Sequence, residues 1–279
     1  MRTYKTEMLL DQLVFAEGLR WHQQALWFSD MWDHKVIRLG SGNKCDTMAQ
    51  VPNRPSGLGF FKDGTPIVVS MTDRCIYTIK DGSLLSFADL SQIVKGDAND
   101  MLVTPDDCIY VGNFGYDLFG GAEFATTNLI LVDGDKNIRA VAEDLTFPNG
   151  MALIDNGATL VVAETWANRL TAFTRLSDGS LTNRRVFAEL GQRTPDGICA
   201  DREDGIWISS FETGEFVRIL EGGQVTDVVN VPGKKAVACA LGGADGKQLY
   251  CSTYAGAIED MHTGKRLGAI EVASVSVAG

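Results

Sequence analysis

The sequence predicts an all-β fold, a six-bladed β-propeller with a metal-binding channel on its axis. A degenerate motif recurs six times, and its copies begin at Glu17, Ser56, Asn99, Asn149, Asp196 and Ala238. Each copy contains an apolar pair, a polar turn and a β-rich run, and the runs centre on Trp27, Val68, Tyr110, Val161, Trp207 and Tyr250. Successive centres lie 41 to 51 residues apart. One four-stranded propeller blade has this length, about 40 to 50 residues.

Turn signals define the first two strands of most blades. The tripeptides KDG, PDD, DNG, EDG and ADG lie at 62–64, 105–107, 155–157, 203–205 and 244–246. Each separates two short apolar runs and is typical of a hairpin. Alternating segments between the copies supply the remaining two strands of each blade, and no helical period persists except briefly around 91–95. We therefore expect almost no helix.

The two ends of the chain are expected to complete the ring. The alternating tail 268–277 is the natural partner of the N-terminal run Leu9–Phe15. Their pairing would hide both strand edges and make residues 1–279 a single propeller domain. A twin-sandwich arrangement is the alternative, and the even spacing of the repeats favours the propeller.

Composition limits the class of partner. The 279 residues carry a formal net charge of −11, with 25 Lys+Arg against 36 Asp+Glu. This balance disfavours nucleic acid and anionic membranes, which are bound by cationic patches. No leader segment or apolar run of membrane-spanning length is visible, so a cytoplasmic protein acting on a small molecule is expected. The six cysteines form no CxxC pair and are expected to be buried thiols, and the oligomeric state stays open.

The repeat places polar side chains in a ring around the channel. Four of the six first positions are carboxylates or carboxamides: Glu17, Asn99, Asn149 and Asp196. Two carboxylates facing each other in a poorly solvated channel repel unless a cation lies between them. Oxygen donors of this kind suit Ca²⁺, Mg²⁺ or Mn²⁺, and Zn²⁺ or Fe²⁺ less well. Turn capping is the alternative role for each Asn and Asp.

Four segments together resemble the senescence marker protein/gluconolactonase/luciferin-regenerating enzyme family. They read EGLRW, AND–PDD–IYVGNFG, PNGMAL–DNG–LVVAET and PDGIC–DGIWIS. The resemblance implies a six-bladed propeller with one divalent metal in its channel, Ca²⁺ first, and lactonase activity. It also implies that Glu17, Asn149 and Asp196 are the metal ligands, and that Asn99 touches the substrate or metal-bound water.

Two features move the expected substrate away from sugar lactones. Members acting on sugar lactones often carry Arg two residues before the equivalent of Asn99, where this chain has Asp97. The longest interval between copies contains the loop 113–128, whose Tyr116, Phe119 and Phe124 would form an aromatic lid over a less polar substrate. Packing of these rings onto the propeller rim is the alternative.

The hypothesis is metal-assisted hydrolysis of a lactone or related activated ester. Asp196 would act as general base and Asn99 would orient the carbonyl or the water. Arg54 would contact an anionic substrate, or form a salt bridge on the rim. Three alternatives stay open: a gluconolactonase-type sugar lactonase, a phosphotriesterase-like hydrolase on the same site, and a non-catalytic calcium-binding regulatory propeller.

Overall fold

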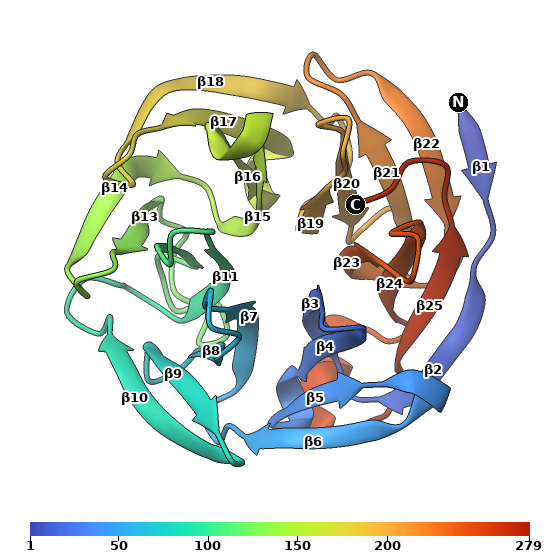
Figure 1. The fold of residues 1–279 in the computed structure, drawn as a ribbon, viewed down its shortest axis with the longest axis horizontal. Helices are drawn as coiled ribbons and strands as arrows, with labels where there is room; N and C mark the ends of the chain where they lie inside the picture. The colour runs from blue at the N-terminus through green and yellow to red at the C-terminus, as the bar shows by residue number, and fades with distance from the viewer.

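Six sheets surround a central axis, five with four strands and one with five (Figure 1). The structure is a computed structural model that describes residues 1–279. It is nearly all β, which confirms the predicted six-bladed propeller. Its five short 3₁₀ helices are η1 (Met31–Asp33), η2 (Ser41–Asn43), η3 (Asp155–Gly157), η4 (Thr165–Ala167) and η5 (Ile258–Thr263). Residues 91–95, where a brief helical period was noted, lie in a turn and the loop after it.

Each blade runs outward from the axis, and the first four blades use consecutive strands. Blade 1 contains β3 (Ala16–His22), β4 (Ala25–Asp30), β5 (Lys35–Leu39) and β6 (Cys45–Gln50). Blade 2 contains β7 (Pro55–Phe60), β8 (Pro66–Ser70), β9 (Cys75–Lys80) and β10 (Ser83–Asp89). Blade 3 contains β11 (Ala98–Val103), β12 (Ile109–Asn113), β13 (Thr127–Val132) and β14 (Ile138–Leu145). Blade 4 contains β15 (Pro148–Ile154), β16 (Thr159–Glu164), β17 (Arg169–Arg175) and β18 (Leu181–Glu189).

The last two blades take up the N-terminal strands. Blade 5 contains β19 (Pro195–Ala200), β20 (Ile206–Ser210), β21 (Glu215–Ile219) and β22 (Val225–Asn230), and β1 (Arg2–Tyr4) adds a fifth, parallel strand beside β22. Blade 6 contains β23 (Lys235–Gly242), β24 (Gln248–Tyr254) and β25 (Gly268–Ser274), and β2 (Glu7–Leu13) is its outer strand. The β2–β25 ladder is antiparallel and pairs Leu10 with Ile270. The N-terminal segment therefore covers the outer edges of two neighbouring blades.

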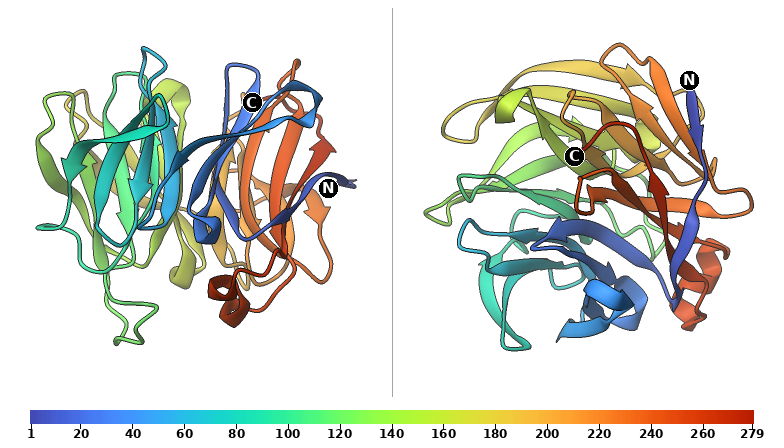
Figure 2. Two further views of the ribbon diagram at one scale, coloured as in Figure 1. Left: turned by 90° about the horizontal axis from the view of Figure 1, so that it is seen from below. Right: turned by 45° about the vertical axis from the view of Figure 1, so that its right-hand side comes forward.

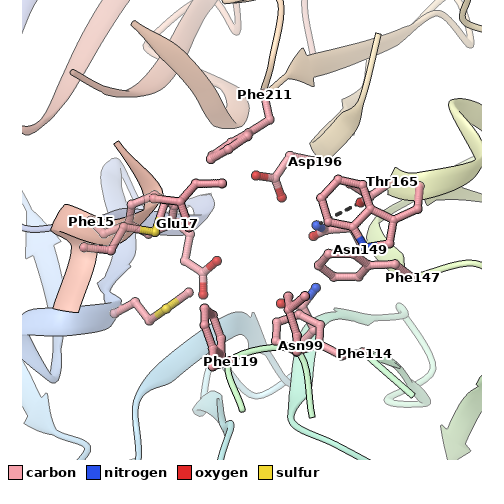
Figure 3. Close-up of a pocket in the computed structure, with 15 residues that line it drawn as sticks. Phe15, Glu17, Asn99, Phe114, Phe119, Phe147, Asn149, Thr165, Asp196 and Phe211 are labelled. Atoms are coloured by element: carbon pink, nitrogen blue, oxygen red, sulfur yellow. Dashed lines mark hydrogen bonds between the residues drawn. The ribbon is translucent and has the colours of Figure 1, made fainter. Parts of the chain in front are cut away.

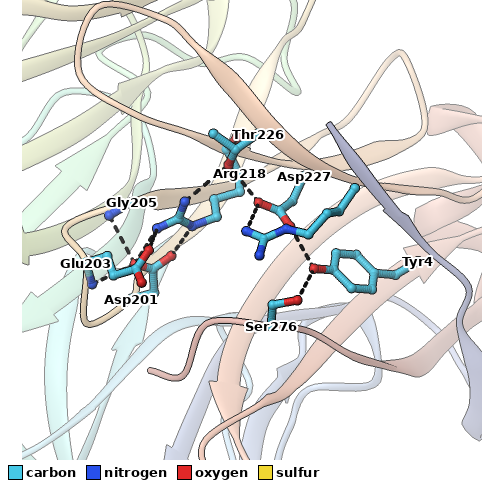
Figure 4. A network of polar contacts seen from close by, with 9 residues as sticks. Tyr4, Asp201, Glu203, Gly205, Arg218, Thr226, Asp227 and Ser276 are labelled. Atoms are coloured by element: carbon cyan, nitrogen blue, oxygen red, sulfur yellow. Dashed lines mark hydrogen bonds and ion pairs between the residues drawn. The ribbon is translucent and has the colours of Figure 1, made fainter.

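A polar network holds β1 to blade 5 (Figure 4). Arg2 Nε and Nη2 donate to the two carboxylate oxygens of Asp227 at 2.6 and 2.9 Å, and the Tyr4 hydroxyl donates to the same carboxylate at 2.7 Å. Asp227 is fully buried at this seam. Its hydrogen bonds and the charge of Arg2 overcome the effect of burial and hold its pKa below the usual range. A buried carboxylate is thus compensated by the strand that it anchors.

The apolar core is divided by the blades. Six clusters of buried side chains each lie between two neighbouring blades. A seventh cluster surrounds one end of the channel and contains Phe15, Met31, Met71, Phe114, Phe147, Val237, Tyr254 and Met261. The loop between β12 and β13 and the helix η5 extend from this face of the ring (Figure 2). The propeller therefore carries an apolar chamber at the end where the innermost strands begin.

Candidate functional site

A β-bulge lies near the start of the innermost strand of every blade. In blades 2 to 5 the bulge begins after Pro55, Ala98, Pro148 and Pro195, and the predicted ring residue follows directly. The bulge of blade 1 lies just after Glu17, and that of blade 6 lies at Val237. Bulges turn a side chain away from its regular direction. The repeated bulge therefore explains how the ring side chains are brought toward the axis, and it moves the sixth ring position from Ala238 to Val237.

Glycines next to the ring residues let the innermost strands approach closely. A Cβ at Gly150 would lie 2.5 Å from Ile198 N and 2.7 Å from Asp196 O, both on the neighbouring blade. A Cβ at Gly57 would lie 2.3 Å from Met101 N. Any side chain at these positions would force the strands apart. The glycines therefore set the width of the channel at the ring.

The four polar residues predicted at the ring line one cavity. Glu17, Asn99, Asn149 and Asp196 meet at a chamber of about 210 Å³, and their polar ends point toward its centre (Figure 3). Ten of its fifteen lining residues are hydrophobic, so the polar groups form a small patch in an apolar wall. The hydrophobic ones are Phe15, Met31, Phe114, Leu118, Phe119, Phe147, Trp166, Phe211, Ile258 and Met261.

The two carboxylates are placed where their charge is poorly solvated. Burial raises the pKa of Glu17 well above its usual range, against a hydrogen bond from Ser56. Burial and the charge of Asp100 raise the pKa of Asp196 to about 8, although Asn149 hydrogen-bonds to it. Glu17 is only 9% exposed, and its Oε1 is buried without a hydrogen-bond partner. An unpaired buried carboxylate oxygen is costly unless a cation or a donor meets it.

The donor set of this cavity fits a hard divalent cation. No group of three or more His, Cys, Asp or Glu side chains is close enough to hold a metal ion, so a cation here would need carboxamide oxygens beside the two carboxylates. Carboxylate and amide oxygens are the ligands that Ca²⁺ accepts, with water completing its shell. The Oε1 atom of Glu17 has no hydrogen-bond partner and is therefore free to act as a metal ligand. The residues present therefore suit the cation that the ring pattern predicts.

The two carboxamides are held in different ways. Asn149 Nδ2 donates to the Thr165 hydroxyl at 3.3 Å, and that hydroxyl donates to the Pro195 carbonyl at 2.8 Å. Asn99 Oδ1 accepts from the Ser56 hydroxyl at 3.3 Å, and its Nδ2 is buried without a partner. Asn149 thus presents an oxygen to the cavity, and Asn99 presents an N–H donor.

The structure does not bring Arg54 or Tyr116 to the cavity wall. Arg54 Nη2 donates to Asp97 at 2.5 Å, and its guanidinium lies 4.7 Å from the Trp32 ring centre and 4.8 Å from that of Phe119. Tyr116 packs against Phe124 of the same loop, with 5.7 Å between ring centres. Phe119 does line the cavity, while remaining 46% exposed. Of the three predicted lid aromatics, Phe119 therefore faces the chamber, and Tyr116 and Phe124 pack against each other within the loop.

Most of the aromatic wall was missed by the sequence analysis, although the repeat carries its signal. The residue two before the ring position accepts a backbone hydrogen bond from the residue that follows the second strand. The pairs are Phe15 with Met31, Arg54 with Met71, Asp97 with Phe114, Phe147 with Thr165, and Thr194 with Phe211, at 2.9 to 3.1 Å. An alignment of the residue two before each ring position with the residue after each second strand would have revealed a second layer of the chamber next to the ring.

Asp100 is a further charged residue that sequence reasoning did not single out. It occupies the position after Asn99, where four other blades have glycine. Its carboxylate accepts from Arg20 Nη2 at 2.8 Å and from Met101 N at 2.8 Å. Asp100 is buried, and its charge raises the pKa of both Glu17 and Asp196. Asp100, paired with Arg20, is therefore a further carboxylate that acts on both charged ring residues.

The fold and this cavity define a six-bladed propeller with a carboxylate and carboxamide ring at one end of its channel. Residues 15–255 match the family described as SMP-30/Gluconolactonase/LRE-like region, and the chain belongs to that family. This confirms the predicted resemblance.

Individual relatives are distant and span nearly the whole chain. Regucalcin from Oryctolagus cuniculus is 24% identical over 259 residues, which cover 90% of this chain and 87% of the relative. A solved luciferin-regenerating enzyme superposes with a TM-score of 0.85 at 18% identity, covering 99% of this chain and 97% of the other. A regucalcin from Agrobacterium tumefaciens, described as a calcium-binding protein, gives a TM-score of 0.83 at 20% identity and covers 100% and 97%. At these identities the structural likeness shows the fold.

Proposed function

We propose that this protein is a divalent-cation-dependent hydrolase that opens a lactone or a related activated ester. The observation that carries the proposal is the polar ring of Glu17, Asn99, Asn149 and Asp196 at the floor of a mostly apolar chamber. The chain's family includes gluconolactonases by name. The apolar wall favours a less polar substrate than a sugar lactone, because buried sugar hydroxyls need hydrogen-bond partners.

Glu17, Asn149 and Asp196 would hold the cation, with Ca²⁺ as first choice and Mg²⁺, Mn²⁺, Zn²⁺ or Fe²⁺ as alternatives. The solved regucalcin described as calcium-binding supports this choice. When bound, such a cation withdraws electron density from the substrate carbonyl and lowers the cost of the negative charge that develops there. It would also favour the ionised forms of Glu17 and Asp196, whose pKa values burial now raises.

Asp196 would act as the general base. A water molecule attacks the carbonyl carbon, and an Asp196 carboxylate oxygen accepts its proton. The carbonyl carbon then loses its bond to the ring oxygen, and that oxygen receives the proton as it leaves. Lactone and water thus become one hydroxy acid. Asn99 Nδ2, which is buried without a partner, would donate to the carbonyl oxygen as its charge grows.

The aromatic wall would select and position the substrate. Phe15, Phe147 and Phe211 lie around the mouth of the polar ring, and Phe119 covers one side from its loop. Arg54 would act by holding this loop, because its guanidinium lies against the rings of Trp32 and Phe119, which also contact each other, and Asp97 accepts a hydrogen bond from it. Tyr116 would support the same loop through Phe124.

Turnover measurements test the proposal. The substrate panel contains lipophilic lactones, aryl esters, sugar lactones and phosphotriesters. It is assayed with chelator-stripped protein and after separate addition of Ca²⁺, Mg²⁺, Mn²⁺ or Zn²⁺. The stripped protein is expected to be inactive. An added cation is expected to restore turnover, and lipophilic lactones are expected to be hydrolysed faster than the other substrates.

A pair of variants tests the role of Asp196. Asp196→Asn should lower kcat/KM by about 10²- to 10⁴-fold, since a general base contributes about that much. Asp204→Asn is the matched control on the same blade: Asp204 is exposed and has φ +58°, which Asn tolerates. It should keep full activity.

Full turnover by the stripped protein would overturn the cation dependence.

Other outcomes identify the alternatives. A clear preference for phosphotriesters or sugar lactones would assign the same ring to that substrate class. Cation binding without turnover of any substrate would support a calcium-binding regulatory propeller instead.

A further inference from the structure

The Thr165 hydroxyl lies between the cavity and the next blade. Thr165 is the first residue of η4, directly after β16, and it is 5% exposed. Its Oγ1 is 2.8 Å from Pro195 O and 3.3 Å from Asn149 Nδ2. Pro195 directly precedes Asp196 in the chain. One hydroxyl thus links a proposed cation ligand of blade 4 to the backbone beside a proposed ligand of blade 5. Figure 3 shows its hydrogen bond with Asn149.

The direction of these hydrogen bonds follows from the atoms involved. A backbone carbonyl only accepts, so the single hydroxyl proton of Thr165 must point to Pro195 O. The hydroxyl oxygen can then only accept from Asn149, and the amide atom facing it must be the NH₂ group. The other N–H of that group is the donor to Asp196, and Oδ1 is left as the amide atom free to bind a cation. The chain of donors fixes the amide orientation without any cation being needed.

We propose that Thr165 is a positioning residue that orients the Asn149 carboxamide for cation binding. This inference rests on the proposed cation site. Without the hydroxyl, the two ends of the amide are nearly equal in shape, and either could turn toward the cavity. An NH₂ group facing a cation is repelled by it, so the misoriented form cannot bind. Loss of the hydroxyl also leaves the carbonyl of Pro195 without its donor, which loosens the backbone next to Asp196.

Cation affinity of three variants tests the inference. Ca²⁺ is titrated calorimetrically into chelator-stripped wild type, Thr165→Val and Thr165→Ser, and thermal unfolding is recorded for each without cation. Thr165→Val keeps the shape and removes the hydroxyl, so its Kd should rise by roughly 10- to 100-fold, the usual loss when a partner of a metal ligand is removed. Thr165→Ser keeps the hydroxyl and should stay within about threefold of wild type.

Thr171→Val is the matched control for stability. Thr171 is buried in the same blade, and its hydroxyl donates to Glu164. Its loss should lower the unfolding temperature and leave the Kd for Ca²⁺ unchanged, since it does not contact Asn149. If the Kd of Thr171→Val rises as much as the Kd of Thr165→Val, general destabilisation is responsible for both changes. That result would overturn the inference.

The two proposals fail in different ways. If wild type binds no Ca²⁺, Mg²⁺ or Mn²⁺, the proposed cation site is wrong and Thr165 has nothing to position. If wild type binds and Thr165→Val binds equally well, the site stands and the role of Thr165 is wrong. If Thr165→Val does not fold, Thr165→Ala compared with Thr165→Ser isolates the hydroxyl without the bulk of Val, and equal affinities of these two would contradict the inference.

Discussion

The two carboxamides of the ring show how one residue type can be prepared for two tasks. On the Asn149 side (Asn149, Thr165 and Pro195), a one-way chain of hydrogen bonds ends at a backbone carbonyl and leaves an amide oxygen for the cavity. On the Asn99 side (Asn99, Ser56 and Glu17), the single Ser56 proton has two nearby acceptors, Asn99 Oδ1 and the Glu17 carboxylate. Here the amide N–H faces the cavity without a partner.

Under the proposed function, this difference would give the two sides complementary roles. A cation needs an oxygen, which the Asn149 side would offer. A substrate carbonyl needs a hydrogen-bond donor, which the Asn99 side would offer. The hydrogen bond from Ser56 to Asn99 depends on the charge of Glu17. Ser56 has one hydroxyl proton, and when it donates this proton to the Glu17 carboxylate it cannot donate it to Asn99. The two functions would be separated by the neighbouring hydroxyl, which accepts a hydrogen bond from Asn149 and donates one to Asn99.

Alanine at each carboxamide should give opposite patterns, and this is the largest effect expected from the comparison. Asn99→Ala removes the donor to the developing negative charge, so kcat should fall by about 10²- to 10³-fold while the Kd for Ca²⁺ changes little. Asn149→Ala removes an oxygen ligand, so the Kd for Ca²⁺ should rise more than tenfold. Steady-state kinetics at saturating Ca²⁺ and calorimetric titration separate the two. Equal changes in both quantities for both variants would abolish the distinction.

Acid should affect two carboxylates near the two sides in opposite directions. Glu164 lies opposite Pro148, the residue before Asn149. Burial would raise the pKa of Glu164, but hydrogen bonds from Arg169, Thr171 and the Thr146 N–H hold it below its usual range. Its contribution to stability is therefore present above the unfolded pKa of about 4.3 and is lost as pH falls through the lower folded value. Glu164→Gln should lower the free energy of unfolding by about 2 kcal/mol at pH 7. The difference from wild type should become smaller below about pH 4.

Asp97 provides the comparison for the other side. Burial raises its pKa, although the charge of Arg54 opposes the shift. A raised folded pKa gives stability that is present below the unfolded pKa of about 3.9 and is lost as pH rises through the folded value. Urea unfolding across pH 3 to 7 should therefore show wild type losing stability relative to Asp97→Asn as pH rises. The same pH trend for Glu164→Gln and Asp97→Asn would contradict the assignment.

The smallest expected effect concerns the contact that brings the Asn149 side close to blade 5. Gly150→Ala places a Cβ against Ile198 N and Asp196 O and should lower the free energy of unfolding by about 1 to 3 kcal/mol. Gly134→Ala is the control, because a Cβ there meets nothing within 4 Å and the residue is exposed. It should change stability by less than about 0.5 kcal/mol. Equal stability of the two variants, measured by urea unfolding, would show that the strands can move apart freely.

The sequence was sufficient for the repeat and for four ring residues because both depend on local pattern. Spacing and turn residues determined the blades, and Glu17, Asn99, Asn149 and Asp196 share one position in them. All four line the same cavity. The sixth position was displaced by one residue, since the motif alone does not reveal that blade 6 places its bulge at Val237.

Contacts between blades were harder to predict. The pairing of β1 with blade 5 depends on the buried Asp227, whose partner is 225 residues away in the chain. The role of Thr165 depends on a carbonyl of the next blade, which no periodicity shows. The loop aromatics were assigned together, and only the folded loop separates Phe119, which faces the chamber, from Tyr116, which does not.

Anomalous diffraction from a crystal grown with Mn²⁺ would test the central claim most directly. The account predicts a single strong peak in the chamber, within about 2.6 Å of oxygens from Glu17, Asn149 and Asp196, and a weaker or absent peak in Glu17→Gln. No peak in the chamber at saturating cation, or a peak held by other residues, would contradict it.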